Sequence, residues 1–253
     1  MSAFYAEETP AAVRNAKGLH LISTLSPNGR KAHIYLEELK DKYGLEWTTS
    51  LIDLDTAEQK KPWYLKLNPN GRIPILIDNT QSPPHVVFES SAILLYLLSS
   101  VDKDHIFGFS DPIEQSQLTQ WLIFWHASGQ PIQGQYNYFR RNAIDESPHA
   151  AQRFKNEVLR IYNVLEIHLS GKYTDSPREY LAGAGKGKYS IADINAWGWL
   201  RTFRSIDLGE DDLAKLPHLA AWVDRIADRP AVQRGSGEWY DEEKHPELLI
   251  RTE

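Results

Sequence analysis

The sequence predicts two successive modules, a small α/β module and then an all-helical one. Between residues 19 and 98, short apolar runs alternate with segments whose apolar residues recur at helical spacing. From residue 112 onward only the helical spacing remains, and this part holds most of the eight tryptophans and twelve tyrosines. A length of 253 residues gives both modules room for a core.

The α/β module is expected over residues 18–102. An arm that is weakly ordered and flexible, residues 1–17, is expected before it, because this stretch is rich in small and charged residues and is interrupted by Pro10. The elements of the module follow in the order β-α-β-(α)-β-β-α. Strands are expected at residues 19–25, 47–54, 73–78 and 86–88, and helices at residues 32–43, 61–67 and 89–98.

Helices alone are expected in the second module, residues 112–234, which a linker at residues 103–111 joins to the first. Ser190 and Asp193 form a capping-box pattern, and Pro217 marks another helix start. Pro131 predicts a kink in the first of these helices. The expected helices cover residues 112–142, 147–170, 190–206 and 213–228, and a charged tail follows at residues 235–253.

Composition argues against several classes of function. The net charge of -6 is unlike that of a general nucleic-acid binder, and no window approaches the roughly 18–20 apolar residues of a membrane span. The first residues lack a signal-peptide core. With no cysteine there is no disulfide or thiolate ligand, and the nine histidines lack metal-site spacing. The expectation is a cytoplasmic protein without metal, nucleic-acid or membrane partners.

Over residues 18–234, several stretches resemble the cytosolic glutathione transferase family. The resemblance is greatest to its nu-class members and to the folded domain of the yeast nitrogen-regulation prion protein. It implies an α+β protein of two domains, a thioredoxin-like α/β domain followed by the all-α domain of glutathione transferases, in a homodimer. The stretches are Ser-Pro-Asn-Gly at 26–29, Asn-Pro-Asn-Gly-Arg-Ile-Pro at 68–74, residues 88–97, Gly134 with Gln135 and Phe139, and Tyr-Ser-Ile-Ala-Asp-Ile at 189–194.

Glutathione is the co-substrate that this resemblance implies. An extended tripeptide can pair with the backbone of Ile73, beside Pro74, in the manner of an added β-strand. The family's proline at this position is cis, so the resemblance predicts a cis bond between Ile73 and Pro74. It also implies that Arg72, in the asparagine-rich turn before them, contributes to the glutathione site.

The two ends of glutathione have their own expected contacts. Ser90, at a strand-to-helix junction, offers a hydroxyl and helix N–H groups to the γ-glutamyl carboxylate, and Glu89 would counter the ammonium. Alternatively Ser90 is an ordinary N-cap, and the two roles are compatible. The resemblance places Gln59, with Lys60 and Lys61, at the glycyl end; for the lysines the alternative is surface charge.

Residues 26–29 precede a predicted helix, and the N-terminus of a helix favours an anion. A thiol with a pKa of about 8.5 is mostly protonated at neutral pH. A helix end and one charge-assisted hydrogen bond can lower that pKa. In the resembling subgroup the asparagine after this proline faces the sulfur of glutathione, so Asn28 is the first candidate for thiol activation and Ser26 the second. The alternative is a tight turn in which Asn28 caps the helix.

Without cysteine, any thiol–disulfide exchange must use the sulfur of glutathione. The second substrate is expected against the helical domain, where the candidate wall residues are Trp125, Gln130, Gln135, Tyr138 and Arg153. Arg153 resembles a position that holds the carboxylates of a second glutathione. The alternative for Arg153 is a surface arginine on a helix.

The sequence therefore predicts an enzyme, a glutathione transferase with glutathione-dependent disulfide reductase or peroxidase activity and a role in detoxification. Its partners would be glutathione or glutathione disulfide, with a small electrophile or disulfide as second substrate. Two alternatives stay open: a regulatory protein that keeps the glutathione pocket, and a conjugating enzyme of one biosynthetic pathway. The arm at residues 1–17 is ordinary in composition, whereas the yeast regulator carries a long Asn/Gln-rich arm, and this difference favours the enzyme.

Overall fold

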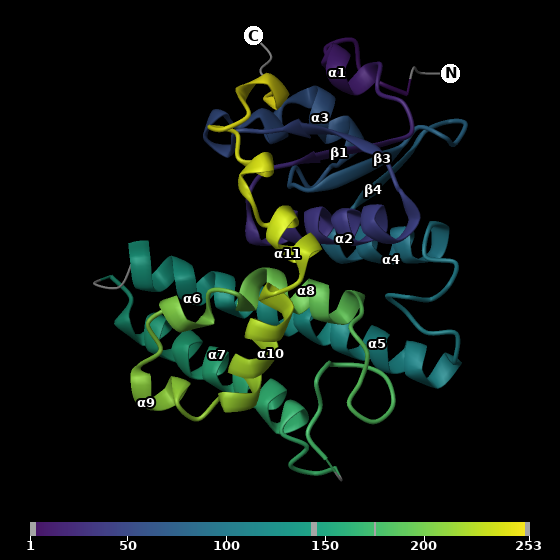
Figure 1. Cartoon of the computed structure of the whole chain (residues 1–253). Coiled ribbons are helices and arrows are strands. Elements are labelled where there is room, and N and C mark those ends of the chain that lie inside the picture. Colours follow the sequence, from purple (N-terminus) through teal and green to yellow (C-terminus); the bar gives the residue numbers. More distant parts are fainter. Residues whose placement is uncertain (1–3, 143–145, 175, 251–253) are drawn as a thin grey trace. The chain divides into compact units, whose positions relative to one another are not determined.

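The computed structural model describes residues 4–142, 146–174 and 176–250. Contacts between residues divide the chain into two compact units. The α/β unit combines residues 1–101 with residues 230–253, so the end of the chain returns to the unit in which the chain begins. The helical unit spans residues 102–229. Figure 1 labels the elements of both units.

A four-stranded mixed sheet forms the centre of the α/β unit, with the strand order β2-β1-β3-β4. β1 runs parallel to β2 and antiparallel to β3, which in turn is antiparallel to β4. This confirms the thioredoxin-like α/β arrangement expected from the sequence. The third strand begins two residues later than expected, because Pro74 has no N–H to give to the sheet. The strands are β1 (Leu19–Ser23), β2 (Trp47–Leu51), β3 (Ile75–Asp78) and β4 (His85–Phe88).

Helices cover both faces of this sheet, and Figure 1 shows α2 and α4 together on one side and α1 and α3 on the other. The core on the α1 and α3 side joins Val13, Ile22 and Trp63, all of them buried. Val13 belongs to α1, so part of the stretch expected as an arm packs into the core. The helices are α1 (Ala11–Arg14), α2 (Pro27–Tyr43), α3 (Pro62–Leu67), α4 (Ser90–Ser100) and α11 (Pro230–Gly235).

The tail after α11 is tied to the α/β unit at several points. The Ile250 N–H donates to the Leu51 carbonyl at 2.8 Å, beside the edge strand β2. The ring of Tyr240, fully buried, stacks on His33 of α2 with 3.7 Å between centroids. The Tyr240 hydroxyl also donates to the Glu37 carboxylate of α2, at 3.3 Å. The tail is therefore an integral layer over α2 rather than a loose extension.

The helical unit contains the expected helices with sharper boundaries. Asp193 accepts from the Ser190 N–H at 3.0 Å, which confirms the expected capping box at the start of α8. Pro217 begins α10 as expected. The unit comprises α5 (Pro112–Phe124), α6 (Gln130–Asn142), α7 (Pro148–Leu169), α8 (Ile191–Leu200), α9 (Glu210–Leu213) and α10 (Pro217–Ala227).

The expected kink at Pro131 takes another form, a π-helical turn at Trp125–Gly129 between α5 and α6. Pro131 directly follows this turn, and its missing N–H and its ring, which disfavour a regular α-helical ladder, are consistent with the local widening. Gly129 permits the turn, because a Cβ there would lie 2.6 Å from Cζ3 of the Trp125 indole. A wide turn of this kind often marks a functional segment of a helix.

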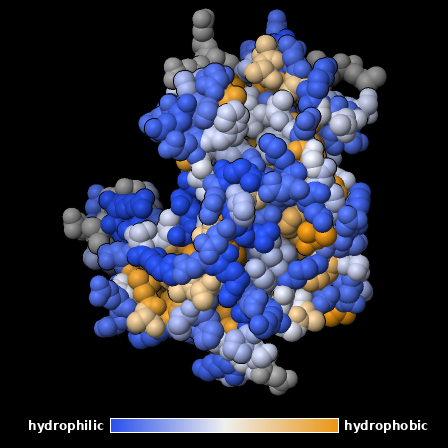
Figure 2. Space-filling model, in the orientation of Figure 1, coloured by the Kyte–Doolittle hydropathy of each residue, from blue (hydrophilic) through white to orange (hydrophobic). Residues whose placement is uncertain are grey.

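Hydrophilic side chains cover most of the face drawn in Figure 2, and apolar side chains appear there in small separate groups. Among the described helices, none combines the length and the apolar character that crossing a membrane requires. The described residues also bring together no group of three or more His, Cys, Asp or Glu side chains that could hold a metal ion.

Candidate functional site

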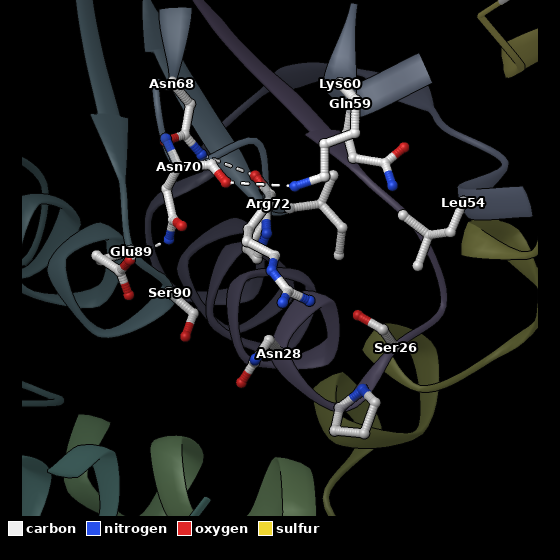
Figure 3. Close-up of a pocket in the computed structure, with 13 residues that line it drawn as sticks. Ser26, Asn28, Leu54, Gln59, Lys60, Asn68, Asn70, Arg72, Glu89 and Ser90 are labelled. Atoms are coloured by element: carbon white, nitrogen blue, oxygen red, sulfur yellow. Dashed lines mark hydrogen bonds between the residues drawn. The ribbon is translucent and has the colours of Figure 1, made fainter. Parts of the chain in front are cut away.

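A cavity of about 340 Å³ opens in the α/β unit, a volume within the range of small-molecule sites. All the site residues predicted for this unit line the cavity except Lys61. They come from the β1–α2 turn, the 3₁₀ helix Glu58–Lys60, the segment before β3 and the β4–α4 junction (Figure 3). The lining residues are Ser26, Pro27, Asn28, Leu54, Gln59, Lys60, Asn68, Asn70, Arg72, Ile73, Pro74, Glu89 and Ser90.

The β1–α2 turn presents the N-terminus of α2 to the cavity. Ser26, not Asn28, is the N-cap, because its hydroxyl oxygen accepts the Gly29 N–H at 3.0 Å. The alternative in which Asn28 caps the helix is therefore wrong. A Cβ on Gly29 would collide with the Thr24 carbonyl oxygen and lie 2.7 Å from Ser23 Oγ, so only glycine fits this close turn.

The asparagine-rich turn before β3 is held by its own side chains. Asn68, which is buried, donates from Nδ2 to the Arg72 carbonyl at 2.8 Å and accepts the Asn70 N–H at 3.0 Å. The Tyr64 hydroxyl donates to the same Arg72 carbonyl at 2.7 Å. Burial raises the pKa of Tyr64, so this hydroxyl stays a donor. The turn is a preorganised support for the segment that follows.

Ile73 and Pro74 are joined by a cis peptide bond, as the resemblance predicted. Pro74 is buried and Ile73 half-buried, and both line the cavity. Among the described residues, no hydrogen-bond partner is found for the N–H or the carbonyl of Ile73. An extended peptide in the cavity can therefore pair with this backbone as an added strand would.

The β4–α4 junction supplies an acidic side chain and a buried hydroxyl. Glu89 is the N-cap of α4, so the interpretation of Ser90 as an ordinary N-cap is wrong; Ser90 is the first residue of the helix. Glu89 has φ +70°, a left-handed conformation that side chains rarely adopt and that clusters at functional sites. Its carboxylate accepts from Asn70 Nδ2 at 3.2 Å, and Ser90 Oγ accepts from the buried Lys31 Nζ at 3.4 Å.

Lys60 and Lys61, which are adjacent in the sequence, have different surroundings in the structure. Lys60 lines the cavity, where its Nζ donates to the Gly71 carbonyl at 2.6 Å. Lys61 lies outside the cavity lining and forms an ion pair with Glu58 at 2.9 Å. Gln59 lines the cavity with a buried Oε1 for which no partner occurs in the described part of the chain. Of the two lysines, Lys60 is therefore the one that brings a positive charge to the cavity.

Arg72 adds a second cation to the cavity. Figure 3 shows its guanidinium reaching into the middle of the lining residues, between Asn28, Ser90 and Ser26. Its side chain is exposed, and no hydrogen bond or ion pair joins it to the residues that the structure describes. The cavity thus combines two cations and one carboxylate, Glu89, which suits a small ligand that carries both carboxylate and ammonium groups.

The residues predicted to contact a second substrate all lie in the helical unit. Trp125, in the π-helical turn, is fully buried, and its indole N–H has no partner among the described residues. Gln130, Gln135 and Tyr138 follow along α6, the first half-buried and the other two exposed. Arg153 is exposed on α7. The role of these five residues in binding a second substrate therefore stays a prediction.

Sequence reasoning missed Pro27, Leu54, Asn68 and Asn70 as lining residues. The two asparagines were visible as a motif, and their repetition around Pro69 is the signal that could have assigned them. Leu54 carries no such signal, because it reaches the cavity from the short 3₁₀ helix Leu54–Thr56, which apolar periodicity does not predict.

Family models match both units. The model of the glutathione S-transferase N-terminal domain matches residues 25–100, and that of the C-terminal domain matches residues 148–225. Among similar proteins, the disulfide-bond oxidoreductase YfcG of Escherichia coli is 35% identical over 210 residues, which cover 81% of this chain and 88% of YfcG.

Solved structures agree with these matches. A glutathione transferase homolog from Lodderomyces elongisporus, determined with two glutathione molecules per subunit, is 36% identical with a TM-score of 0.75, covering 87% of this chain and 98% of that one. Ure2p in complex with glutathione is 30% identical, also with a TM-score of 0.75, covering 87% of this chain and 99% of that one. The chain therefore belongs to the glutathione transferase family, and to its Ure2-like subgroup.

Proposed function

We propose that the protein binds glutathione in the cavity of the α/β unit and uses its thiolate as the nucleophile, chiefly to reduce disulfides. The observation that carries this proposal is the position of the α2 N-terminus, with Asn28 and Ser26, at a cavity that also holds the Ile73 backbone and the β4–α4 junction. The glutathione-bound relatives and the oxidoreductase YfcG support the assignment.

Each group of glutathione has a counterpart in the cavity. The γ-glutamyl carboxylate fits the Ser90 hydroxyl and the N-terminus of α4, and its ammonium fits Glu89. The cysteinyl unit pairs with the backbone of Ile73. The glycyl carboxylate fits Lys60, with Gln59 beside it, and Lys60 takes the place expected for Lys61.

The sulfur then lies at the tip of α2. Lowering a thiol pKa by one unit requires about 1.4 kcal/mol of additional stabilisation of the thiolate. A helix N-terminus contributes about 0.3–1 kcal/mol, and a charge-assisted hydrogen bond adds about 1.5–3 kcal/mol. Asn28 is the first candidate for this donor, as the family resemblance implies. Ser26 is the second, because its oxygen accepts the Gly29 N–H while its hydroxyl proton can still be donated. Both are neutral donors, so the site stabilises a thiolate without a strong base.

Disulfide reduction by this site proceeds in two exchanges. The glutathione thiolate attacks one sulfur of the bound disulfide, which forms a mixed disulfide with glutathione and releases the other half as a thiolate. A second glutathione thiolate attacks that mixed disulfide, which yields glutathione disulfide and the second thiolate. No protein thiol takes part, because the chain has no cysteine. The same bound thiolate can attack an electrophile or a peroxide.

The second substrate, the oligomeric state and the location in the cell are part of the same proposal. We assign the second substrate to the side of the helical unit that carries Trp125, Gln130, Gln135, Tyr138 and Arg153. A homodimer and a cytoplasmic location, where glutathione is abundant and reduced, complete the assignment. Light scattering of the purified protein tests the dimer.

Turnover of hydroxyethyl disulfide with glutathione tests the reaction, and glutathione calorimetry tests binding. The Asn28→Ala variant is expected to lose at least about tenfold in kcat/KM for glutathione, equivalent to one 1.4 kcal/mol interaction, while Ser26→Ala keeps activity. Asn156→Ala, an exposed asparagine of α7, is the matched control and should match the parent protein. The opposite ranking of the two variants would move the role to Ser26. Absence of glutathione binding at millimolar concentration would overturn the proposal.

A further inference from the structure

Lys31 is a lysine with no exposed surface, on the helix that carries Asn28. Lysines are almost never fully buried unless their ammonium is paired. The Lys31 Nζ donates to Ser90 Oγ at 3.4 Å, and so connects α2 to the first residue of α4. Ser90 lines the cavity whereas Lys31 does not, so the ammonium lies directly behind the Ser90 hydroxyl.

We propose that Lys31 is a positioning residue of the glutathione site, whose buried Nζ orients the Ser90 hydroxyl and, as an ammonium, attracts the γ-glutamyl carboxylate from behind it. This inference rests on the proposed function, since it concerns the same cavity. It adds a group that the ligand does not touch and a dependence on pH that the lining residues alone do not supply.

The surroundings of Lys31 support a change of charge on binding. Burial lowers the pKa of Lys31 to about 7, while the charge of Glu89 opposes this shift. A bound carboxylate on the other side of Ser90 would add a second negative charge and raise the pKa of Lys31. Between pH 7 and the raised value, the lysine is then neutral without ligand and protonated with it, and linkage requires that affinity falls as pH rises.

Other titrating groups near α2 do not produce this dependence. On α2 itself, burial holds the pKa of His33 well below its usual range, so His33 is neutral throughout. Arg30, also on α2, keeps its charge at these pH values. The helices packed against α2 offer only groups already engaged: on α4, Tyr96, which donates to Asp78, and on α11, Arg234, which pairs with Glu37 and Asp41.

Calorimetry with S-methylglutathione from pH 6 to pH 9 tests the inference, because this probe keeps the γ-glutamyl group and has no titrating thiol. Its α-ammonium, which pairs with Glu89, also titrates in the upper part of this range, so the contribution of Lys31 is the difference between the parent protein and Lys31→Met. Titrations in two buffers of different ionisation enthalpy count the protons taken up. For the parent protein, Kd should rise about tenfold over this range, with net proton uptake near pH 8. In Lys31→Met, Kd at pH 6 should be at least about tenfold higher, and proton uptake should fall to the amount that the α-ammonium of the ligand alone accounts for. Lys31→Arg should keep the affinity at pH 6 and show the same reduced proton uptake as Lys31→Met, because arginine does not titrate.

Lys42→Met, an exposed lysine on the same helix, is the matched control and should reproduce the parent profile. Thermal melts establish that each variant is folded. A purely structural role for Lys31 would change the melting temperature without changing proton uptake, and that result overturns the inference. Failure of the parent protein to bind S-methylglutathione at all would instead count against the proposed function. Equal proton uptake by the parent protein and by Lys31→Met would overturn the Lys31 inference alone.

Discussion

Replacing Asp193 with alanine should destabilise the helical unit more than any change at its surface. The carboxylate is fully buried and accepts four hydrogen bonds, from the Ser190 N–H and hydroxyl, the Leu181 N–H and the Trp222 indole N–H, at 2.9–3.1 Å. It therefore joins the start of α8 to α10 and to the loop before α8.

The magnitude follows from those four bonds. Loss of the capping box costs about 1 kcal/mol. The Leu181 and Trp222 donors would remain buried without an acceptor, at about 1–3 kcal/mol each. Allowing for water that enters the space left by the carboxylate, the free energy of unfolding should fall by about 4 kcal/mol. For a chain of this size, that lowers the melting temperature by about 10 °C.

Denaturant unfolding, followed by tryptophan fluorescence and circular dichroism, measures the change. Asp224→Ala is the matched control, since Asp224 lies on α10 in an exposed ion pair with Arg204 at 2.8 Å. Exposed pairs contribute about 0–1 kcal/mol, so this variant should stay close to the parent protein. Equal losses in the two variants, or a loss below about 1 kcal/mol for Asp193→Ala, would refute the reasoning.

Three further outcomes are expected. Tyr240→Ala should lower the free energy of unfolding by about 3–5 kcal/mol, because the ring is fully buried against α2. A denaturant titration in which this variant is as stable as the parent protein would contradict the role given to the tail. Gly29→Ala should lower the free energy of unfolding by about 1–3 kcal/mol and weaken glutathione binding, because the added Cβ would overlap the Thr24 carbonyl oxygen. Calorimetry that finds the parent affinity for glutathione in this variant would disprove this. The pKa of Lys31 is lowered to about 7, against 10.5 for an ordinary lysine, so the folded state binds fewer protons than the unfolded state between these pH values. The free energy of unfolding should therefore rise with pH across this window, by at most about 1.4 kcal/mol per pH unit. A Lys31→Met variant with the same rise would exclude Lys31 as its source.

Much of this fold could be predicted because its signals are local. The order of strands and helices along the chain follows from apolar runs and turns, and the capping box at Ser190 and Asp193 is visible as two residues at fixed spacing. The predicted residues of the cavity followed from the family resemblance that contiguous motifs carry, and of these residues only Lys61 lies outside the lining. It is displaced by one position because the 3₁₀ helix Glu58–Lys60 directs Lys60 toward the Gly71 carbonyl.

Other features depend on contacts between distant parts of the chain, which no local pattern reveals. Tyr240 and Ile250 lie in a stretch of charged residues, so their burial in the α/β unit could not be foreseen. Val13 lies in a segment that looked like an arm. Lys31 looked like any surface lysine, because its burial requires Ser90, which is 59 residues away in the chain. These residues were missed for one reason, since their environment is made by tertiary packing.

Titration of the thiol of bound glutathione tests the account most directly. The ultraviolet absorbance of the thiolate, followed against pH for the complex and for free glutathione, gives the two pKa values. We predict that the pKa in the complex lies at least one unit below that of free glutathione, and that Asn28→Ala returns it most of the way. A complex in which the thiol titrates as in free solution would contradict the claim that the N-terminus of α2 activates the sulfur.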